Sequence, residues 1–563
     1  MKKKYFESIK NLAIIAAIIA FVIYIPNLND GFLSDDYDFL SRMDHITNVD
    51  TAYEQFNPSR HGFWRPLLNT SFMVNYLVFG EQDAFTYHFL NNLLHAIIAG
   101  FLVLITYHIF KNKKVAFLSG LIFGLYPMHH ESVTWIAGRT DVLAAFFFVL
   151  SLYFGIIYFK NKHTKHLIYS LILSACAFLS KEMALTLPVI LFIINIVWFR
   201  EKNILYYVKT YIPFAFIWIL YFIGRFFSIG FFIGGYMTFG QTNHLSVPIL
   251  ATLVSPTYYF TKMFNYAFLA EYPSIFIQSL SHILFDYRKI ILLIILVSLF
   301  LLQKRKGLKT VFKNVIVLYI LIILIAAPAW SMLVNIQMNG MDTRFLYFPT
   351  IFASILLAYL LAGIKNKIIK NTFITICLAS FVILNVVHYI PWQRADNIKT
   401  DILTKLSQQK SEILEGELIY VAHIPDNYFG AYIFRNGFAE SFENIVHDES
   451  ILSDYNNRTI WQLKDDDMQG YMCRDHLLNG THLYIWNPVT TEFVDKSNML
   501  PLNKDFENTP IPFTTESKKK YNIVSWKNTL WENGPENINI KYAKQDNPKD
   551  FLSTCPLWLL SNI

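Results

Sequence analysis

The stretch YHFLNNLLHAIIAGFLVLITYHIFKNKK, residues 87–114, decides the class of fold. Its middle is an apolar run near residues 88–110, long enough for the roughly 20 apolar residues that a helix needs to cross a bilayer. The run ends in the basic segment KNKK at 111–114, and Lys and Arg concentrate on the cytoplasmic side of membrane proteins. The stretch therefore predicts a membrane-spanning helix whose C-terminal end faces the cytoplasm.

The composition of the whole chain agrees with this prediction. Of its 563 residues, 54% are hydrophobic and only 16% are charged, whereas a soluble globular chain carries about 25% charged residues. This shortage of charge argues against a disordered chain, against nucleic acid as a partner and against an ordinary soluble enzyme. The four cysteines are not closely paired in sequence, which excludes a disulfide scaffold or a cysteine-based zinc module.

Similar apolar runs recur along the chain, separated by basic loops. Eleven membrane spans are predicted, near residues 9–28, 88–110, 115–128, 142–160, 167–180, 184–199, 209–228, 288–303, 311–333, 344–363 and 371–391. With the basic loops inside, this odd number puts the N-terminus in the cytoplasm and the C-terminus outside it. The first span is interpreted as uncleaved, because no A-x-A-like cleavage site follows it. The apolar stretch 247–270 would break this parity, so it is expected to lie on or dip into the outer face, with a true span as the alternative.

The composition changes after residue 391. The segment from there to residue 563 carries 17 Lys and Arg against 24 Asp and Glu, a net charge of −7, which leaves +14 on the membrane part. We therefore expect a transmembrane domain of residues 1–391, with a long outer loop at 29–87, and an extracytoplasmic α/β domain of residues 392–563. Cys473 and Cys555 lie in the second domain, either as a disulfide or as two buried thiols.

Ionisable residues gather at the predicted outer ends of the spans, where they are costly unless they are paired or functional. The first group is SDDYDF at 34–39, with Asp35 and Asp36. Two neighbouring carboxylates push their pKa values apart, so that one can act as a general base. The pair could instead hold a divalent cation, or Ser34 or Asp35 could cap a short surface helix.

The second group is SRHGFWRPLLNTSF at 59–72, which places Arg60, His61 and Arg65 before a helix that Pro66 is expected to start. Arginine binds phosphate through two parallel hydrogen bonds, so a phosphate ligand is one interpretation and contact with lipid headgroups is the other.

The third group is His88, Asn91 and His95, which share one face of a helix and are more typical of a packed polar seam than of a metal site. The remaining groups also lie at predicted outer ends of spans. They are His129, His130, Glu131, Arg139 and Asp141, then Lys181 with Glu182, and then Asp342 with Arg344. An ion pair of Glu131 with Arg139 is the simplest interpretation of the set at 129–141. Together, these groups of ionisable residues favour an outward-facing polar cavity with basic walls, suited to an anionic phosphate group.

Taken in order, these segments resemble the GT-C superfamily of polytopic glycosyltransferases, which use lipid-linked sugar donors. In particular, they are similar to the transmembrane O-mannosyltransferases with TPR tails and to their bacterial relatives. The resemblance covers about residues 1–390 and rests on six segments: SDDYDF, WRPL, YHFLNNLLH, YPMHHESVTWIAGRTDVLA, LSKEMALTLP and TRFLYFP. The chain departs from the family after residue 391, where its sequence shows no TPR repeat.

The resemblance implies a catalytic domain at 1–391 that transfers a sugar from a polyprenyl-phosphate-linked donor to a hydroxyl of a protein or glycan, with inversion, outside the cytoplasm. It implies Asp35 or Asp36 as the base and implicates four cations in binding the donor phosphate: Arg65, Arg139, Lys181 and Arg344. The residues expected to line the site are Arg60, His61, His88, His95, His130, Glu131 and Glu182. No cofactor is required, although a divalent cation is compatible with the acidic pair.

Two further expectations complete this interpretation. The frequent Lys, Ile and Asn indicate an AT-rich bacterial genome, and hence a bacterial inner membrane. The alternative function is a transporter or flippase of lipid-linked glycans. It predicts polar residues at mid-span depth and an internal repeat, and the sequence shows neither.

Overall fold

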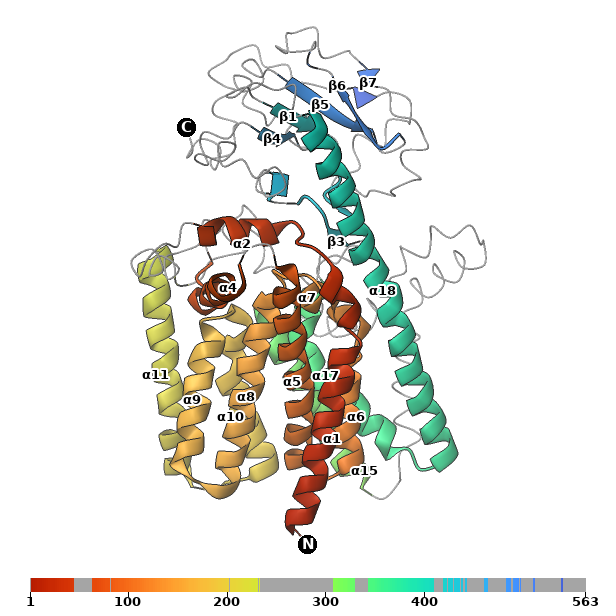
Figure 1. The fold of residues 1–563 in the computed structure, drawn as a ribbon. Helices are drawn as coiled ribbons and strands as arrows, with labels where there is room; N and C mark the ends of the chain where they lie inside the picture. Colours follow the sequence, from red (N-terminus) through yellow and green to blue (C-terminus); the bar gives the residue numbers. More distant parts are fainter. Residues whose placement is uncertain are drawn as a thin grey trace. The chain divides into compact units, whose positions relative to one another are not determined.

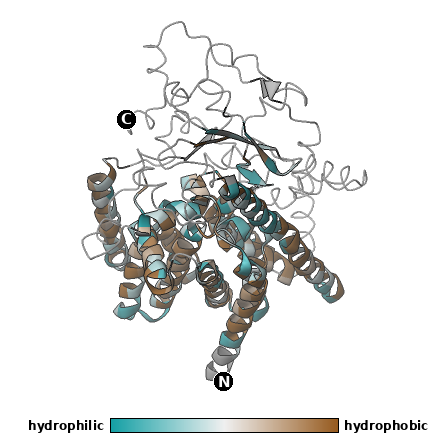
Figure 2. Cartoon of the chain, turned by 45° about the horizontal axis from the view of Figure 1, so that its top comes forward, coloured by the Kyte–Doolittle hydropathy of each residue, from teal (hydrophilic) through white to brown (hydrophobic). Residues whose placement is uncertain are grey.

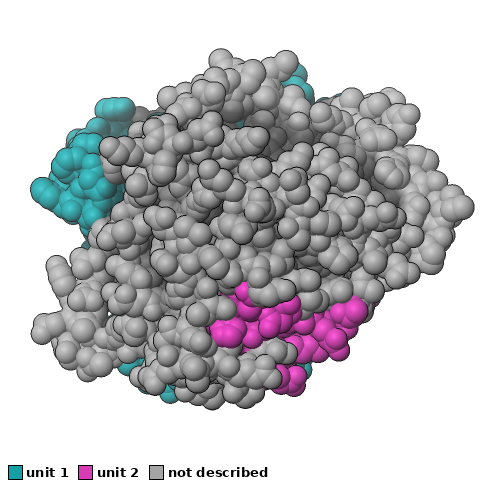
Figure 3. All heavy atoms as spheres, turned by 90° about the horizontal axis from the view of Figure 1, so that it is seen from above, with its two compact units in different colours: residues 1–31, 42–390 teal, residues 32–41, 391–563 magenta. Residues whose placement is uncertain are grey.

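The computed structural model describes residues 2–44, 63–80, 83–201, 203–230, 232, 307–329 and 343–409, and shorter pieces of the rest: 419–422, 424–428, 430–435, 437–438, 441–442, 460–463, 482–487, 490–495, 497, 510–511 and 538–539. The chain forms two compact units, coloured separately in Figure 3. The first comprises Met1–Gly31 and Arg42–Ile390, and the second Phe32–Ser41 and Pro391–Ile563.

The first unit is helical. Its α-helices are α1 (Lys2–Val22), α4 (Pro66–Phe79), α5 (Ala84–Phe110), α6 (Lys113–Gly124), α7 (His130–Val133), α8 (Arg139–Asn161), α9 (Thr164–Phe178), α10 (Leu187–Ile194), α11 (Ile204–Ile229), α15 (Leu308–Ala326), α17 (Tyr347–Gly363) and the part of α18 (Lys367–Gln409) up to Ile390. Short 3₁₀ or π turns join them: η1 (Ile25–Asn29), η3 (Pro127–His129), η4 (Glu182–Thr186), η5 (Asn195–Phe199), η8 (Ala327–Ala329) and η9 (Thr343–Leu346). Helices α1, α5, α6, α8 and α9 run side by side, with α5 packed against α1, α6 and α8 (Figure 1).

Seven of the described helices are long and apolar enough to cross a membrane, and α1 and α9 contain shorter apolar helices. Hydrophobic colour covers much of the helical part of the chain in Figure 2. A mostly helical membrane protein is therefore confirmed. Ten of the predicted apolar runs coincide with described helices, whereas the run 288–303 and the stretch 247–270 lie outside the described residues.

The basic loops between helices are tight turns with a simple local cause. Lys111, Lys162 and Arg200 each end a helix in the left-handed conformation. The side chain of Asn112 then caps α6 by accepting hydrogen bonds from the backbone N–H groups of residues 114 and 115. A cation at a helix C-terminus also interacts favourably with the helix dipole. These loops therefore join neighbouring helices with few residues.

Small residues let α1, α5 and α6 approach closely. A Cβ atom placed on Gly120 of α6 would lie 2.8 Å from the main-chain oxygen of Ala99 in α5, and one on Gly124 would lie 2.6 Å from the Cβ atom of Ala20 in α1. Within a bilayer, helices associate through such close packing rather than through the hydrophobic effect.

Replacing Gly120 with Val is therefore expected to destabilise the first unit by about 1–3 kcal/mol, because the added methyl groups push α6 from the α5 backbone. A lower melting temperature of the purified protein in detergent would show this. Ile14→Val, at a position of α1 that is 58% exposed, is the control and should melt like the parent. An unchanged melting temperature for Gly120→Val would contradict the packing.

The second unit contains a four-stranded sheet in the order β4-β1-β5-β6. Its strands are β1 (Ile419–Ala422), β4 (Ile460–Leu463), β5 (His482–Asn487) and β6 (Glu492–Asp495), and β1 lies parallel to both β4 and β5. Two further pairs of strands are short: the hairpin of β2 (Asn427–Tyr428) and β3 (Ala431–Tyr432), and the antiparallel pair of β7 (Pro510–Ile511) and β8 (Ile538–Asn539). Strand β1 lies within the apolar stretch LIYVAHI at 418–424, whereas Cys473 and Cys555 lie outside the described residues.

Candidate functional site

Three segments of the first unit meet at the N-terminal end of α4. Pro66 opens α4 at its first helical position, as predicted, which leaves Arg65 in the connection just before the helix. The N–H of Leu67 donates to the main-chain oxygen of Leu179, which holds this connection against the end of α9. Lys181 and Glu182 follow directly, where the chain turns into η4.

Helix α11 closes the third side. Trp218, Tyr221 and Arg225 lie along one face of α11, because residues three and four apart in a helix are neighbours. The indole of Trp218 donates to the main-chain oxygen of Leu185 in η4. The ring of Trp64 lies 5.6 Å from that of Tyr221 and against Gly224, where a Cβ atom would clash with it. These contacts bring Arg65 and Arg225 to the same carboxylate.

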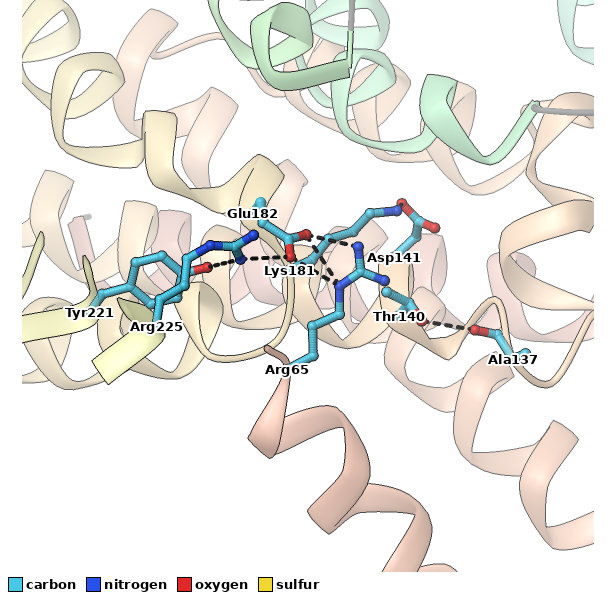
Figure 4. Close-up of polar contacts among 8 residues, drawn as sticks. All are labelled: Arg65, Ala137, Thr140, Asp141, Lys181, Glu182, Tyr221 and Arg225. Carbon is cyan, nitrogen blue, oxygen red and sulfur yellow. Dashed lines mark hydrogen bonds and ion pairs between the residues drawn. The ribbon is translucent and has the colours of Figure 1, made fainter. Parts of the chain in front are cut away.

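Glu182 stands between the two arginines (Figure 4). Arg65 donates to Oε2 of Glu182 from Nη2 at 2.8 Å and from Nε at 3.1 Å, the two-pronged contact that a guanidinium makes with a carboxylate or a phosphate. Nη1 of Arg225 lies 3.3 Å from Oε1 of the same carboxylate and 3.3 Å from the hydroxyl of Tyr221. The cluster of Arg65, Glu182 and Arg225 thus carries two cations and one anion.

The cluster is partly open. The side chains of Glu182 and Arg65 are 21% and 13% exposed, and that of Arg225 is 2% exposed. The Arg65 guanidinium also lies 4.1 Å from the ring centroid of Phe63, a cation–π distance. The geometry therefore offers an anion two guanidinium groups, one of which is accessible.

Beside the cluster is a buried ion pair between Lys181 and Asp141, with Nζ 2.5 Å from Oδ1 (Figure 4). Their side chains are 2% and 1% exposed. Asp141 lies in the first turn of α8, where the helix dipole favours a negative charge. The pair therefore joins the turn into η4 to the start of α8.

Replacing Asp141 with Ala is expected to destabilise the protein by about 3–5 kcal/mol, because it leaves the Lys181 ammonium buried without its carboxylate. The double variant Asp141→Leu with Lys181→Met removes both charges and is expected to regain most of that loss. Melting temperatures in detergent compare the two. Equal melting of Asp141→Ala and the parent would show that the pair contributes little.

The predicted ion pair of Glu131 with Arg139 is wrong. Arg139 is fully buried and donates from Nε to Asn91 at 2.9 Å and from Nη2 to Asn75 at 3.0 Å and to the main-chain oxygen of Tyr87 at 3.1 Å. These contacts tie the start of α8 to α4 and α5, because an interior guanidinium needs its donors satisfied.

Glu131 instead binds η9. Its Oε2 accepts from the hydroxyl of Thr343 at 2.8 Å and from the N–H of Arg344 at 3.0 Å, and its Oε1 lies 3.6 Å from Nε of Arg344. The Glu131 side chain is buried, whereas that of Arg344 is 15% exposed. The four cations predicted to bind one phosphate therefore have different partners. Arg65 binds Glu182, Lys181 binds Asp141, Arg139 binds Asn91 and Asn75, and Arg344 binds Glu131.

The histidines form a packed polar seam. His88 donates to the main-chain oxygen of Asp30, and His95 contacts the hydroxyl of Tyr347 at 2.8 Å. Burial, and after it the proximity of His388, lowers the pKa of His130 to about 3, so this side chain is neutral near pH 7. Within the described ranges, no group of three or more His, Cys, Asp or Glu side chains is arranged to hold a metal ion.

The acidic pair belongs to the second unit. Helix α2 (Asp35–Asp44) begins there, and Oδ2 of Asp36 accepts from the N–H of Leu33 at 2.8 Å. Asp36 is 1% exposed, whereas Asp35 is half-buried and accepts from the hydroxyl of Ser34 at 3.3 Å. The Asp36 carboxylate thus binds the backbone just before α2, and Asp35 is the more exposed carboxylate.

Three of the predicted positions have no description in the structure, and Arg225 joins the cluster although it was not predicted. Arg60, His61 and Asp342 lie outside the described residues. Arg225 was not predicted, because the run 209–228 was interpreted only as a membrane span. Its signal was present in the sequence: an ionisable residue inside such a span is a candidate for function.

No family model matches the chain. It is 29% identical over 189 residues to the protein O-mannosyl-transferase Tmtc1 of Drosophila melanogaster, covering 31% of this chain and 22% of that protein. It is also 29% identical over 236 residues to the protein O-mannosyl-transferase tmtc2 of Xenopus laevis, covering 36% of this chain and 27% of that protein. The matches thus span about a quarter of the length of these relatives.

Among solved structures, ArnT from Cupriavidus metallidurans bound to undecaprenyl phosphate aligns with 84% of this chain and 93% of its own, with a TM-score of 0.44 and 10% identity. The resemblance predicted from the six ordered segments is confirmed by the curated relatives: about a third of this chain is similar to protein O-mannosyl-transferases.

Proposed function

We propose that the chain is a membrane glycosyltransferase that moves a sugar from a polyprenyl-phosphate-linked donor to a hydroxyl of a protein or glycan on the extracytoplasmic side. The observation that supports this best is the partly exposed cluster of Arg65, Glu182 and Arg225, at the end of apolar helices. Such a place suits a ligand with a charged phosphate and a hydrocarbon tail. The names of the curated relatives support sugar transfer.

In this proposal the donor phosphate binds Arg65 and Arg225. As the bond between the sugar's anomeric carbon and the phosphate oxygen breaks, the phosphate keeps the electron pair and gains charge. Two guanidinium groups stabilise that charge more in the transition state than in the bound donor. Arg344 is a further cation that an anionic group could reach, whereas the buried Arg139 and Lys181 act by holding helix ends in place.

The acceptor hydroxyl needs a base. We assign this role to Asp35, because it is the more exposed of the two and Asp36 already accepts from the N–H of Leu33. The carboxylate takes the proton as the acceptor oxygen attacks the anomeric carbon on the face opposite the phosphate, so the configuration inverts. These steps do not require a metal ion, and a divalent cation at the acidic pair is compatible with them.

The membrane arrangement is also proposed. Eleven spans, with residues 288–303 among them, would place the N-terminus in the cytoplasm and an α/β domain of residues 392–563 outside it. Reporter fusions after Lys113 and within residues 392–563 should then report opposite sides of the membrane. Both reporters on one side would contradict this arrangement.

A comparison of cells tests the function itself. Extracytoplasmic proteins and glycans from cells with the gene should carry a hexose-sized mass that is missing when the gene is deleted and returns with the wild-type gene. Restoration by a gene that carries both Asp35→Asn and Asp36→Asn would contradict the assigned base. Identical masses with and without the gene would contradict the function.

A further inference from the structure

Glu182 occupies the position that the proposed function gives to a phosphate. Both of its carboxylate oxygens face a guanidinium, Oε2 toward Arg65 and Oε1 toward Arg225. A carboxylate and a phosphate present arginine with the same kind of acceptor, two oxygens that take two parallel N–H groups. Glu182 therefore satisfies the two arginines as an anionic ligand would.

Exposure distinguishes Glu182 from the neighbouring acid. Asp141 and Lys181 form a pair whose side chains are 1% and 2% exposed, which closes it to an external anion. Glu182 is 21% exposed, and its partner Arg65 is 13% exposed. Water and anions from solution can reach both partners of this pair and compete with Glu182 for Arg65. The arginines can therefore exchange Glu182 for another anion.

We propose that Glu182 is an internal anion that exchanges with the lipid phosphate. It holds Arg65 and Arg225 in position between reaction cycles, leaves them when the donor binds, and returns to them as the product departs. This inference rests on the proposed function, and it names a step of that function: release of the polyprenyl monophosphate product.

The different charges of the donor and the product give the reason for this exchange. The cluster of Arg65, Glu182 and Arg225 has a formal charge of +1, and the two arginines alone have +2. The donor is a phosphodiester with one negative charge. The product is a phosphomonoester, whose second pKa of about 6 gives it nearly two negative charges at neutral pH. The arginines therefore hold the product more strongly than the donor, and a competing carboxylate lowers that difference.

Glu182→Gln tests the exchange, because it keeps the shape and hydrogen-bonding capacity of the side chain and removes its charge. Farnesyl phosphate, a short polyprenyl monophosphate, is the probe. Its dissociation constant for the purified protein at pH 7.5 is expected to fall by about tenfold in Glu182→Gln, as expected when a charged competitor is lost. In turnover, kcat and the KM for the donor should both fall, because product release becomes slower.

Two variants make the result specific. Glu201→Gln removes the same charge from a surface pair with Lys162 and is expected to bind farnesyl phosphate like the parent. Glu182→Asp keeps the charge with a shorter reach and should tighten binding by a smaller factor than Glu182→Gln. It also provides a second measurement if Glu182→Gln folds poorly, which the melting temperature would show.

The outcomes separate the exchange from the proposed function. Tighter binding in Glu182→Gln and unchanged binding in Glu201→Gln support the exchange. Equal or weaker binding in Glu182→Gln than in the parent overturns it, and means that Glu182 only positions the arginines. Absence of farnesyl phosphate binding by every protein, the parent included, overturns the proposed phosphate site and the exchange with it.

Discussion

Replacing Arg225 with Gln is expected to slow sugar transfer by about 100-fold or more, the usual cost of losing one group that stabilises charge in a transition state. Arg225 is 2% exposed and contacts Glu182 and Tyr221 within the first unit. It therefore stands in a partly dehydrated place, where its charge acts more strongly on a leaving phosphate than it would in water. The rate of polyprenyl monophosphate release, followed by mass spectrometry, measures the effect.

The same change should weaken the binding of farnesyl phosphate, since both the bound phosphate and the transition state contact the guanidinium. Arg200→Gln is the matched control, because Arg200 ends η5 in the left-handed conformation and contacts none of the three residues of the cluster within the described part of the chain. Full activity of Arg225→Gln would remove this arginine from the phosphate site.

Replacing Asp35 with Asn is expected to lower kcat by about 100-fold to 10,000-fold, the range in which a general base contributes, with little change in donor binding. The amide keeps the size of the carboxylate but cannot accept the acceptor's proton. A single-turnover measurement with saturating donor isolates this step from product release.

Two neighbouring carboxylates serve as controls for Asp35. Asp38→Asn, in the same first turn of α2, should transfer sugar like the parent. Asp36→Asn should mainly lower the melting temperature, because the buried Asp36 carboxylate accepts from the N–H of Leu33 just before α2. Loss of transfer in Asp36→Asn with full transfer in Asp35→Asn would move the base to Asp36.

The sequence predicted those parts of the fold that depend on neighbouring residues. The apolar run in 87–114 forms α5, and KNKK forms a tight turn because Lys111 ends one helix and Asn112 caps the next. Pro66 opens α4 because its fixed backbone angle suits the first position of a helix. Each of these outcomes follows from local geometry, which a sequence shows directly.

The pairing of charges could not be predicted in the same way. Glu131 and Arg139 are eight residues apart in sequence, yet Glu131 binds Thr343 and Arg344, more than 200 residues away. Packing of α4 and α5 surrounds Arg139 with the amides of Asn91 and Asn75 instead. Which ion pair forms depends on which helix ends meet, and an individual segment does not contain that information.

The candidate site was predicted in part for the same reason. Arg65 and Glu182 were both selected from the sequence, and the structure brings them into contact across 117 residues. Arg225 was missed because a long apolar run hides one ionisable residue. Its contact with Glu182 forms because Trp64 and Tyr221 pack together and bring α11 to that carboxylate.

Transfer of a sugar out of a polyprenyl-phosphate-linked donor is the proposed reaction of this protein. The most direct measurement incubates the purified protein with polyprenyl-phosphate mannose and an extracytoplasmic extract from cells that lack the gene, and follows donor, polyprenyl monophosphate and acceptor-bound sugar by mass spectrometry. Donor is expected to be lost while polyprenyl monophosphate and acceptor-bound sugar appear in equal amounts, and Arg225→Gln should form both about 100-fold or more slowly. Donor that stays intact in solution, or that only crosses the bilayer when the protein is placed in vesicles, would contradict transfer and indicate a transporter.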